Sequence, residues 1–216
     1  MPKQIIMEKF KTFKSAVISG LCIGIAGWGY LATMNIIGAV LFSFGLLAVV
    51  NYKLALYTGT AGFIKFYNDK GQLSVAPSLG HLLLILLGNI VGCLLIALLA
   101  RLSPLELGTT AQGILEGRLA VGYWQSGILA IACGFIMTTI VTFARKGILL
   151  PMLFGIPLFI ICGFPHSVAD SFYYGTISLD YLQAHWSEIL LLHPCLVLGN
   201  FIGCNLYRLV MGANPE

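Results

Sequence analysis

The stretch LGNIVGCLL at residues 87–95 returns as LGNFIGCNL at residues 198–206, identical at six of nine positions and 111 residues further on. A second pair of strings points the same way, because SGLCIGIA starts at Ser19 and SGILAIA starts at Ser126, 107 residues later. Similarity at a nearly fixed offset indicates an internal repeat. The chain is therefore predicted to contain two related halves, at about 15–101 and 122–211.

Composition places both halves in a membrane. Of the 216 residues, 58% are hydrophobic and 9% are charged, whereas soluble domains carry roughly 25% charged residues. The charged residues are clustered and leave long apolar runs, each near or beyond the roughly 20 residues that cross a hydrocarbon core. The first run divides at the turn-prone Met34, Asn35 and Gly38. The predicted spans are 15–33, 37–57, 79–100, 122–143, 147–171 and 188–210.

The basic residues predict how these six spans are oriented. Lysines before the first span are followed by no small-residue cleavage site, so the first span is expected to remain as a helix. They place the N-terminus in the cytoplasm, and six crossings return the C-terminus to that side. The basic residues expected on the cytoplasmic side are Lys3, Lys9, Lys11, Lys14, Lys65, Lys70, Arg145 and Lys146. The net charge of +4 is thus explained by topology, and nucleic-acid binding is not predicted.

Three spans in each half force the two halves into opposite orientations, as in many transporters and channels. The second and fifth spans should then correspond, and both contain residues that interrupt helices. Span two contains Lys53 and the turn-forming run at 58–62, and span five contains Gly163 and Pro165 just before His166. Non-helical backbone at membrane depth persists only where protein or a water-filled cavity satisfies its polar groups. The two interrupted spans are therefore predicted to enclose a permeation path.

The polar chemistry of the spans is sparse. The six cysteines lie in apolar spans without a CxxC pair, so they are expected to be small buried residues, and no metal or cofactor is predicted. A histidine within a span is costly unless it is paired or hydrated, and its unperturbed pKa of about 6.5 allows proton exchange near neutrality. His166 is therefore a candidate proton relay.

Several motifs, in this order and spacing, resemble those of the formate/nitrite transporter family, pentameric channels with formate, nitrite and hydrosulfide members. They are GAVLFSFGLL at 38–47, LYTG at 56–59, GNIVG at 88–92, SGILA at 126–130, GIPLFIICGFPHSVAD at 155–170 and GNFIG at 199–203. The resemblance implies one transmembrane channel domain, residues 1–216, with an aquaporin-like protomer. It also implies a homopentamer in the cell inner (plasma) membrane.

The resemblance also implies roles for individual residues. Phe42 and Leu46 would form a cytoplasmic-side constriction, and Phe159 would form the periplasmic-side constriction. His166 would be the central pore histidine, and Thr58 would lie on the loop that interrupts span two. Two lysines, Lys146 and the extra Lys53, would lend positive potential to the path.

These roles combine into a hypothesis about transport. Small monovalent anions of weak acids, such as formate, nitrite or hydrosulfide, would be attracted by Lys146 and Lys53. An apolar constriction opposes a bare anion by several kcal/mol or more, and a proton acquired at His166 would remove most of that barrier. A channel for a small neutral solute on the same scaffold remains an alternative. An intramembrane enzyme using His166 and Asp170 is not predicted, because the sequence contains neither an HExxH nor a GxSxG pattern.

The chain departs from the family pattern at positions that bear on the substrate. Lys53-Leu54-Ala55 stands where a Gly-Ala-acidic triplet is common, and Pro165 replaces the acidic residue before the histidine. Asp170 replaces an asparagine, and Ile131 replaces another in span four. The departures put selectivity for formate or nitrite in question and leave the architecture intact.

Overall fold

The computed structural model describes residues 2–65 and 75–212, so the prediction for Lys70 falls outside the described residues. All the regular structure within these ranges is helical, which confirms the all-α class. The elements are α1 (Pro2–Thr33), α2 (Ile36–Leu41), α3 (Ser43–Asn51), α4 (Tyr57–Thr60), η1 (Ala61–Phe63), α5 (Val75–Leu102), α6 (Leu107–Val121), α7 (Tyr123–Arg145), α8 (Met152–Ile161), α9 (Ser167–Thr176) and α10 (Leu179–Met211).

Four helices, α1, α5, α7 and α10, are long and apolar enough to cross a bilayer. Their outward faces are apolar too: on α5, for example, Leu87, Leu94 and Leu98 are all exposed. Such continuous apolar surface is typical of a protein surrounded by lipid or by other subunits. Four of the six predicted spans are therefore single helices.

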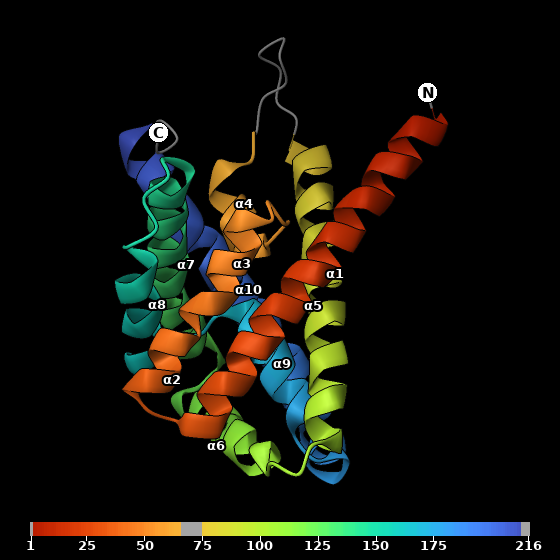
Figure 1. Cartoon of the computed structure of the whole chain (residues 1–216), viewed down its shortest axis with the longest axis vertical. Coiled ribbons are helices and arrows are strands. Elements are labelled where there is room, and N and C mark those ends of the chain that lie inside the picture. The colour runs from red at the N-terminus through yellow and green to blue at the C-terminus, as the bar shows by residue number, and fades with distance from the viewer. Residues whose placement is uncertain (1, 66–74, 213–216) are drawn as a thin grey trace.

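The long helices pack in two pairs, α1 along α5 and α7 along α10. In Figure 1, α1 and α5 run from the upper to the lower end of the molecule, whereas α7 and α10 run upward. The first described residues of α1 and the last of α10 therefore lie at the same, upper end, as the topology prediction requires.

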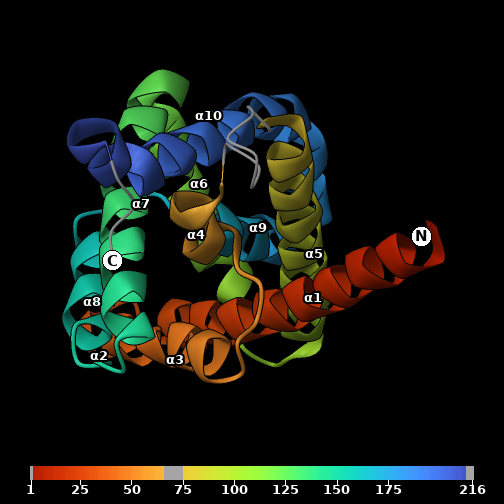
Figure 2. The ribbon, with the colours of Figure 1, turned by 90° about the horizontal axis from the view of Figure 1, so that it is seen from above.

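The second and fifth spans are interrupted, as predicted, but the run at 58–62 that was expected to interrupt span two is itself helical, in α4 and η1, so Thr58 lies after the break and not in it. After α3 ends at Asn51 the chain is not helical again until Tyr57, and after α8 ends at Ile161 it is not helical until Ser167. Each break contains a residue with left-handed backbone, Lys53 (φ 54°) and Gly163 (φ 68°). Figure 2 shows α4 and α9, which follow the two breaks, in the middle of the bundle.

One asparagine anchors the break in the first half. The Asn89 side chain accepts a hydrogen bond from Tyr57 N at 2.8 Å, at the start of α4. It donates to the carbonyl oxygens of Ala16 at 2.8 Å and Ala55 at 2.9 Å. One side-chain amide thus satisfies Tyr57 N and Ala55 O, two backbone groups at the break. Where water is excluded, such groups need a partner from the protein.

Asn200, from the second repeated string, anchors the other break in the same way. Its side chain accepts from Ser167 N at 2.8 Å, at the start of α9, and donates to the carbonyl oxygens of Ala130 and Pro165, both at 2.9 Å. The repeated string therefore makes the same structural contact in both halves, an asparagine bonded to the backbone of a break.

The predicted register between the first and fourth spans is wrong. A Cβ added to Gly20 would lie 2.1 Å from Asn89 O, and one added to Gly134 would lie 2.2 Å from Asn200 O, so these two glycines occupy corresponding positions. The sequence strings had paired Gly20 with Gly127 instead. The error is seven residues, about two helical turns, which leaves the small residues on the same face and explains the misleading match.

The structure also contains more helix than predicted. Residues 102–121 were expected to form a loop, but α6 occupies most of that segment at the lower end. Similarly, α9 and α10 cover nearly all of the predicted loop at 172–187. The cause is that hydropathy marks only the apolar part of a helix, whereas helical hydrogen bonding continues into polar residues.

Candidate functional site

The two interrupted spans meet at the side chains of Thr58 and His166. Thr58 lies in the first turn of α4 and His166 is the residue before α9. Their side chains are hydrogen-bonded, with Thr58 Oγ1 2.8 Å from His166 Nε2, and both residues are buried. The structure thus brings together the two predicted relay residues, which are 108 positions apart in the chain.

The backbone around His166 fixes the protonation pattern of the neutral ring. His166 caps α9, and its Nδ1 accepts a hydrogen bond from Ala169 N at 3.2 Å. Because Nδ1 is an acceptor there, the proton of the neutral imidazole lies on Nε2 and is donated to Thr58 Oγ1. The Thr58 hydroxyl hydrogen is then free to be donated to an acceptor in the path. A second proton on the ring would displace the bond from Ala169.

One phenylalanine ring stacks against this histidine, and a second contacts the first. The Phe159 ring lies nearly parallel to the imidazole with centroids 5.8 Å apart, and the Phe42 ring meets Phe159 edge-on at 6.2 Å. The predicted assignment of Phe42 and Leu46 to one constriction and of Phe159 to another therefore stays a prediction, with the Phe42 and Phe159 rings in direct contact. Phe42 lies between α2 and α3, where its backbone keeps right-handed helical angles (φ −57°, ψ −27°).

Two cavities approach this buried group from opposite ends. The lower cavity, about 350 Å³, is lined by His166, Phe159 and Arg118 among others. The upper cavity, about 260 Å³, lies beside the end of α7 and is lined by Leu46, Leu56 and neighbours of Thr58 such as Gly59. Phe159 and His166 thus line the lower cavity and the two leucines line the upper one, whereas the buried Phe42 and Thr58 line neither.

The two predicted lysines occupy different places. Lys53 lines the upper cavity, together with Arg145. Lys146 is exposed at the end of α7 and is not among the residues that line either cavity. Arg145 was predicted only as one of the cytoplasmic basic residues. Its guanidinium lies 3.5 Å from the centroid of the Phe63 ring, in a cation–π contact.

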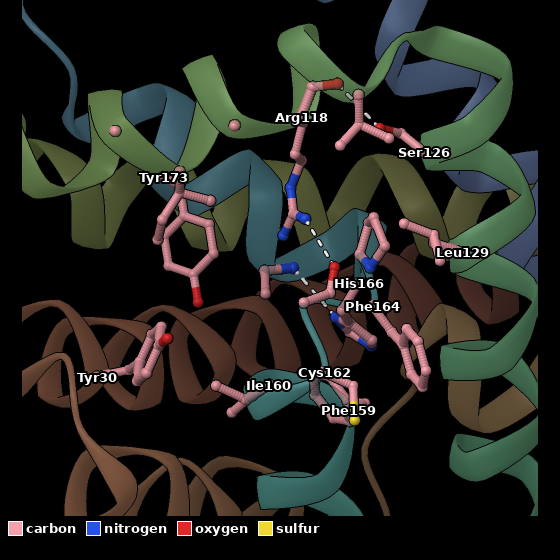
Figure 3. Close-up of a pocket in the computed structure, with 17 residues that line it drawn as sticks. Tyr30, Arg118, Ser126, Leu129, Phe159, Ile160, Cys162, Phe164, His166 and Tyr173 are labelled. Carbon is pink, nitrogen blue, oxygen red and sulfur yellow. Dashed lines mark hydrogen bonds between the residues drawn. The ribbon is translucent and has the colours of Figure 1, made fainter.

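Arg118 was missed as a site residue. Figure 3 shows its side chain reaching from α6 into the cavity that His166 and Phe159 also line. Its Nη2 and Nε bond the same oxygen of Asp170 at 2.9 and 3.0 Å, and the Asp170 side chain is fully buried. The sequence signal for Arg118 was weak, because it is a lone arginine that follows Gly117 in the segment between two predicted spans.

The cysteines contradict one detail of the sequence reading. Cys93, Cys133 and Cys204 are buried as expected, but Cys162 is exposed and lines the lower cavity. Its position follows from the break after α8, which carries it out of the packed helix.

Comparison with known proteins gives consistent matches. A family model described as formate/nitrite transporter matches residues 2–212. The formate channel FocA of Haemophilus influenzae is 24% identical over 200 residues, which cover 82% of this chain and 69% of that protein. A solved pentameric formate channel with formate bound has a TM-score of 0.81 at 19% identity, covering 95% of this chain and 96% of that one. A solved FNT family ion channel has a TM-score of 0.72 at 21% identity, covering 92% and 87%.

Proposed function

Because the chain belongs to the formate/nitrite transporter family, we propose that it conducts small monovalent anions of weak acids, such as formate, nitrite or hydrosulfide, across the membrane. The Haemophilus relative is named a formate channel, and one solved structure of the same fold holds formate. That structure is a pentamer, which supports a homopentamer with one path in each protomer. The whole chain, 1–216, forms one channel domain of two inverted repeats.

The cell inner (plasma) membrane is the proposed location, with both termini in the cytoplasm. Basic residues support this orientation, because Lys9 and Lys11 belong to the first turns of α1 and Arg145 ends α7, and in Figure 1 both of these helix ends lie at the upper end. The upper cavity then opens toward the cytoplasm and the lower cavity toward the opposite side.

The hydrogen bond between Thr58 and His166 carries the proposal. Thr58 and His166 come from different interrupted spans and form a buried bond that can carry a proton, with one cavity toward each end of the molecule. An anion that passes the rings of Phe42 and Phe159 loses its water, which costs several kcal/mol or more. In the proposed step a protonated His166 gives up its proton, an N–H bond breaks and the O–H or S–H bond of the acid forms. The neutral acid crosses, and solvent reprotonates the ring.

Lys53 has two properties that one variant tests by separate measurements, the positive charge of its side chain and the strain of its left-handed backbone. Left-handed backbone costs an L-residue roughly 1–2 kcal/mol, and glycine avoids this cost. Lys53→Gly is therefore expected to raise the free energy of unfolding by about 1 kcal/mol and to slow anion entry from the upper side. Thermal unfolding in detergent and influx into oriented liposomes measure the two effects. Unchanged entry at every anion concentration would remove Lys53 from the path.

The rings of Phe42 and Phe159 are expected to limit the size of the permeant. Phe159→Ala removes a ring that contacts both Phe42 and His166. It should raise acetate flux relative to formate flux by about tenfold, since lowering a barrier by about 1.4 kcal/mol has that effect. Phe154→Ala, on the same helix at an exposed position, is the matched control and should leave the ratio unchanged. An unaltered ratio in Phe159→Ala would argue that the narrow point lies elsewhere.

A panel of solutes in stopped-flow liposome assays tests the proposed function. Formate, nitrite and hydrosulfide should cross rapidly, with a flux that increases as the pH falls. The alternative is a channel for a neutral solute, in which Thr58 and His166 would serve as hydrogen-bond partners. Flux of urea or ammonia without flux of any weak acid would favour that alternative, and anion currents in a planar bilayer would exclude it.

A further inference from the structure

We propose that Arg118 and Asp170 form an anion-binding site at the lower mouth of the path, and that Arg118 selects planar oxyanions there. The inference rests on the proposed function and names a substrate class for it, namely small carboxylates and other anions with two acceptor oxygens. Arg118 lines the same cavity as His166, so an anion held by its guanidinium lies on the way to the Thr58–His166 pair.

The hydrogen bonds of Arg118 leave two of its N–H groups available among the described residues. Nε and Nη2 both donate to Asp170 Oδ1, which occupies the edge formed by these two nitrogens. Nη1 donates to Gly163 O at 3.3 Å. Of the five N–H groups, these bonds use three, and within the described residues one N–H on Nη1 and one on Nη2 remain. These two N–H groups can each donate to one oxygen of a carboxylate or of nitrite.

The burial of the pair explains why the site holds its shape. The Asp170 side chain is fully buried and that of Arg118 is 13% exposed. Oδ2 of Asp170 accepts no hydrogen bond from any described residue, so the carboxylate has Arg118 as its partner. The two bonds to Asp170 hold the guanidinium in place. The exposed part of the Arg118 side chain faces the cavity that it lines. A fixed fork loses little side-chain entropy when it binds an anion.

The pair also accounts for one departure from the family pattern. Asp170 stands four residues after His166, where the family commonly has asparagine. A buried carboxylate needs a compensating cation, and Arg118 supplies it from α6. The substitution thereby brings a guanidinium to the cavity, whereas the amide of an asparagine would need no such partner.

The test uses variants that change the charge of the pair in different ways. Removing Arg118 alone would leave Asp170 as an unpaired buried charge, so the informative variant is the double substitution R118Q/D170N. The half-saturating formate concentration in liposome influx from the lower side should rise about tenfold, because charge-assisted hydrogen bonds are lost. In D170N, Arg118 keeps its charge without a carboxylate partner, and the half-saturating concentration should fall.

A separate variant tests whether Arg118 prefers planar oxyanions to spherical anions. R118K keeps the positive charge but loses the planar fork, so formate and nitrite should bind less tightly while inhibition by chloride stays unchanged. Glu116→Gln, an exposed position on the same helix, removes one negative charge as D170N does. It should not alter the half-saturating concentration.

Shifts of opposite sign in D170N and R118Q/D170N support the site, since a merely structural role would impair both. Equal half-saturating concentrations in the wild type and R118Q/D170N overturn it. Thermal stabilisation of the purified protein by sodium formate separates this inference from the proposed function. Stabilisation that R118Q/D170N abolishes supports the site even if no flux is found, whereas stabilisation that persists in that variant overturns it.

Discussion

Replacing His166 by phenylalanine is expected to abolish the pH dependence of weak-acid flux and to lower the flux near neutral pH by tenfold or more. Phenylalanine preserves a ring against Phe159 but removes both the proton and the bond to Thr58. The anion must then pass the rings without a proton donor, and each 1.4 kcal/mol of added barrier slows it about tenfold. Formate uptake into proteoliposomes between pH 5 and 8 measures the effect.

A second variant, His166→Asn, distinguishes hydrogen-bond donation from proton transfer. Asparagine can donate to Thr58 but does not titrate, so proton transfer predicts a loss as large as that in His166→Phe. Near-normal flux and pH profile in His166→Asn would show that a donor alone suffices. That outcome would also agree with the neutral ring inferred from the bond between Ala169 N and Nδ1.

Replacing Asn200 by leucine is expected to lower the free energy of unfolding by roughly 2–5 kcal/mol. Its side chain satisfies Ser167 N and the carbonyl oxygens of Ala130 and Pro165, all buried. A buried polar group left without a partner costs about 1–3 kcal/mol. Because Ser167 follows His166 directly, we also expect the ring to lose its position and the flux to fall. Denaturant titration in detergent, followed by circular dichroism, measures the change.

The control for this variant is Asn51→Leu. Asn51 is exposed, and among the described residues its side chain bonds only the carbonyl oxygen of Leu47, one turn earlier. Substitution there should alter stability by no more than about 0.5 kcal/mol. Asn89→Leu should behave like Asn200→Leu, since Asn89 anchors the other break. Stability of Asn200→Leu equal to that of the wild type would contradict the anchoring role.

Much of the fold was predictable because the spans are dictated by hydropathy and the breaks by residues that helices avoid. Gly163 and Pro165 fall in the observed break, and Lys53 falls in the other one. What escaped prediction depends on packing. The contact between the Phe42 and Phe159 rings joins two segments far apart in the chain, and only the fold shows it.

The site was predictable to the extent that a motif marked it. His166 and Thr58 were identified through the motifs, and the structure brings them into contact. Arg118 was not, because its importance arises from Asp170, 52 residues away along the chain. Asn89 and Asn200 both lie in the repeated strings. Their bonds to non-helical backbone, however, could not be predicted without the three-dimensional structure.

The matching asparagine anchors also make His166 and Leu56 counterparts, since each immediately precedes a helix that its asparagine holds. One half of a symmetric frame thus presents an imidazole where the other presents an aliphatic chain. A passive pore cannot choose the net direction of flow, which the gradients set. Its barrier profile is nevertheless asymmetric, so influx and efflux should saturate at unequal concentrations.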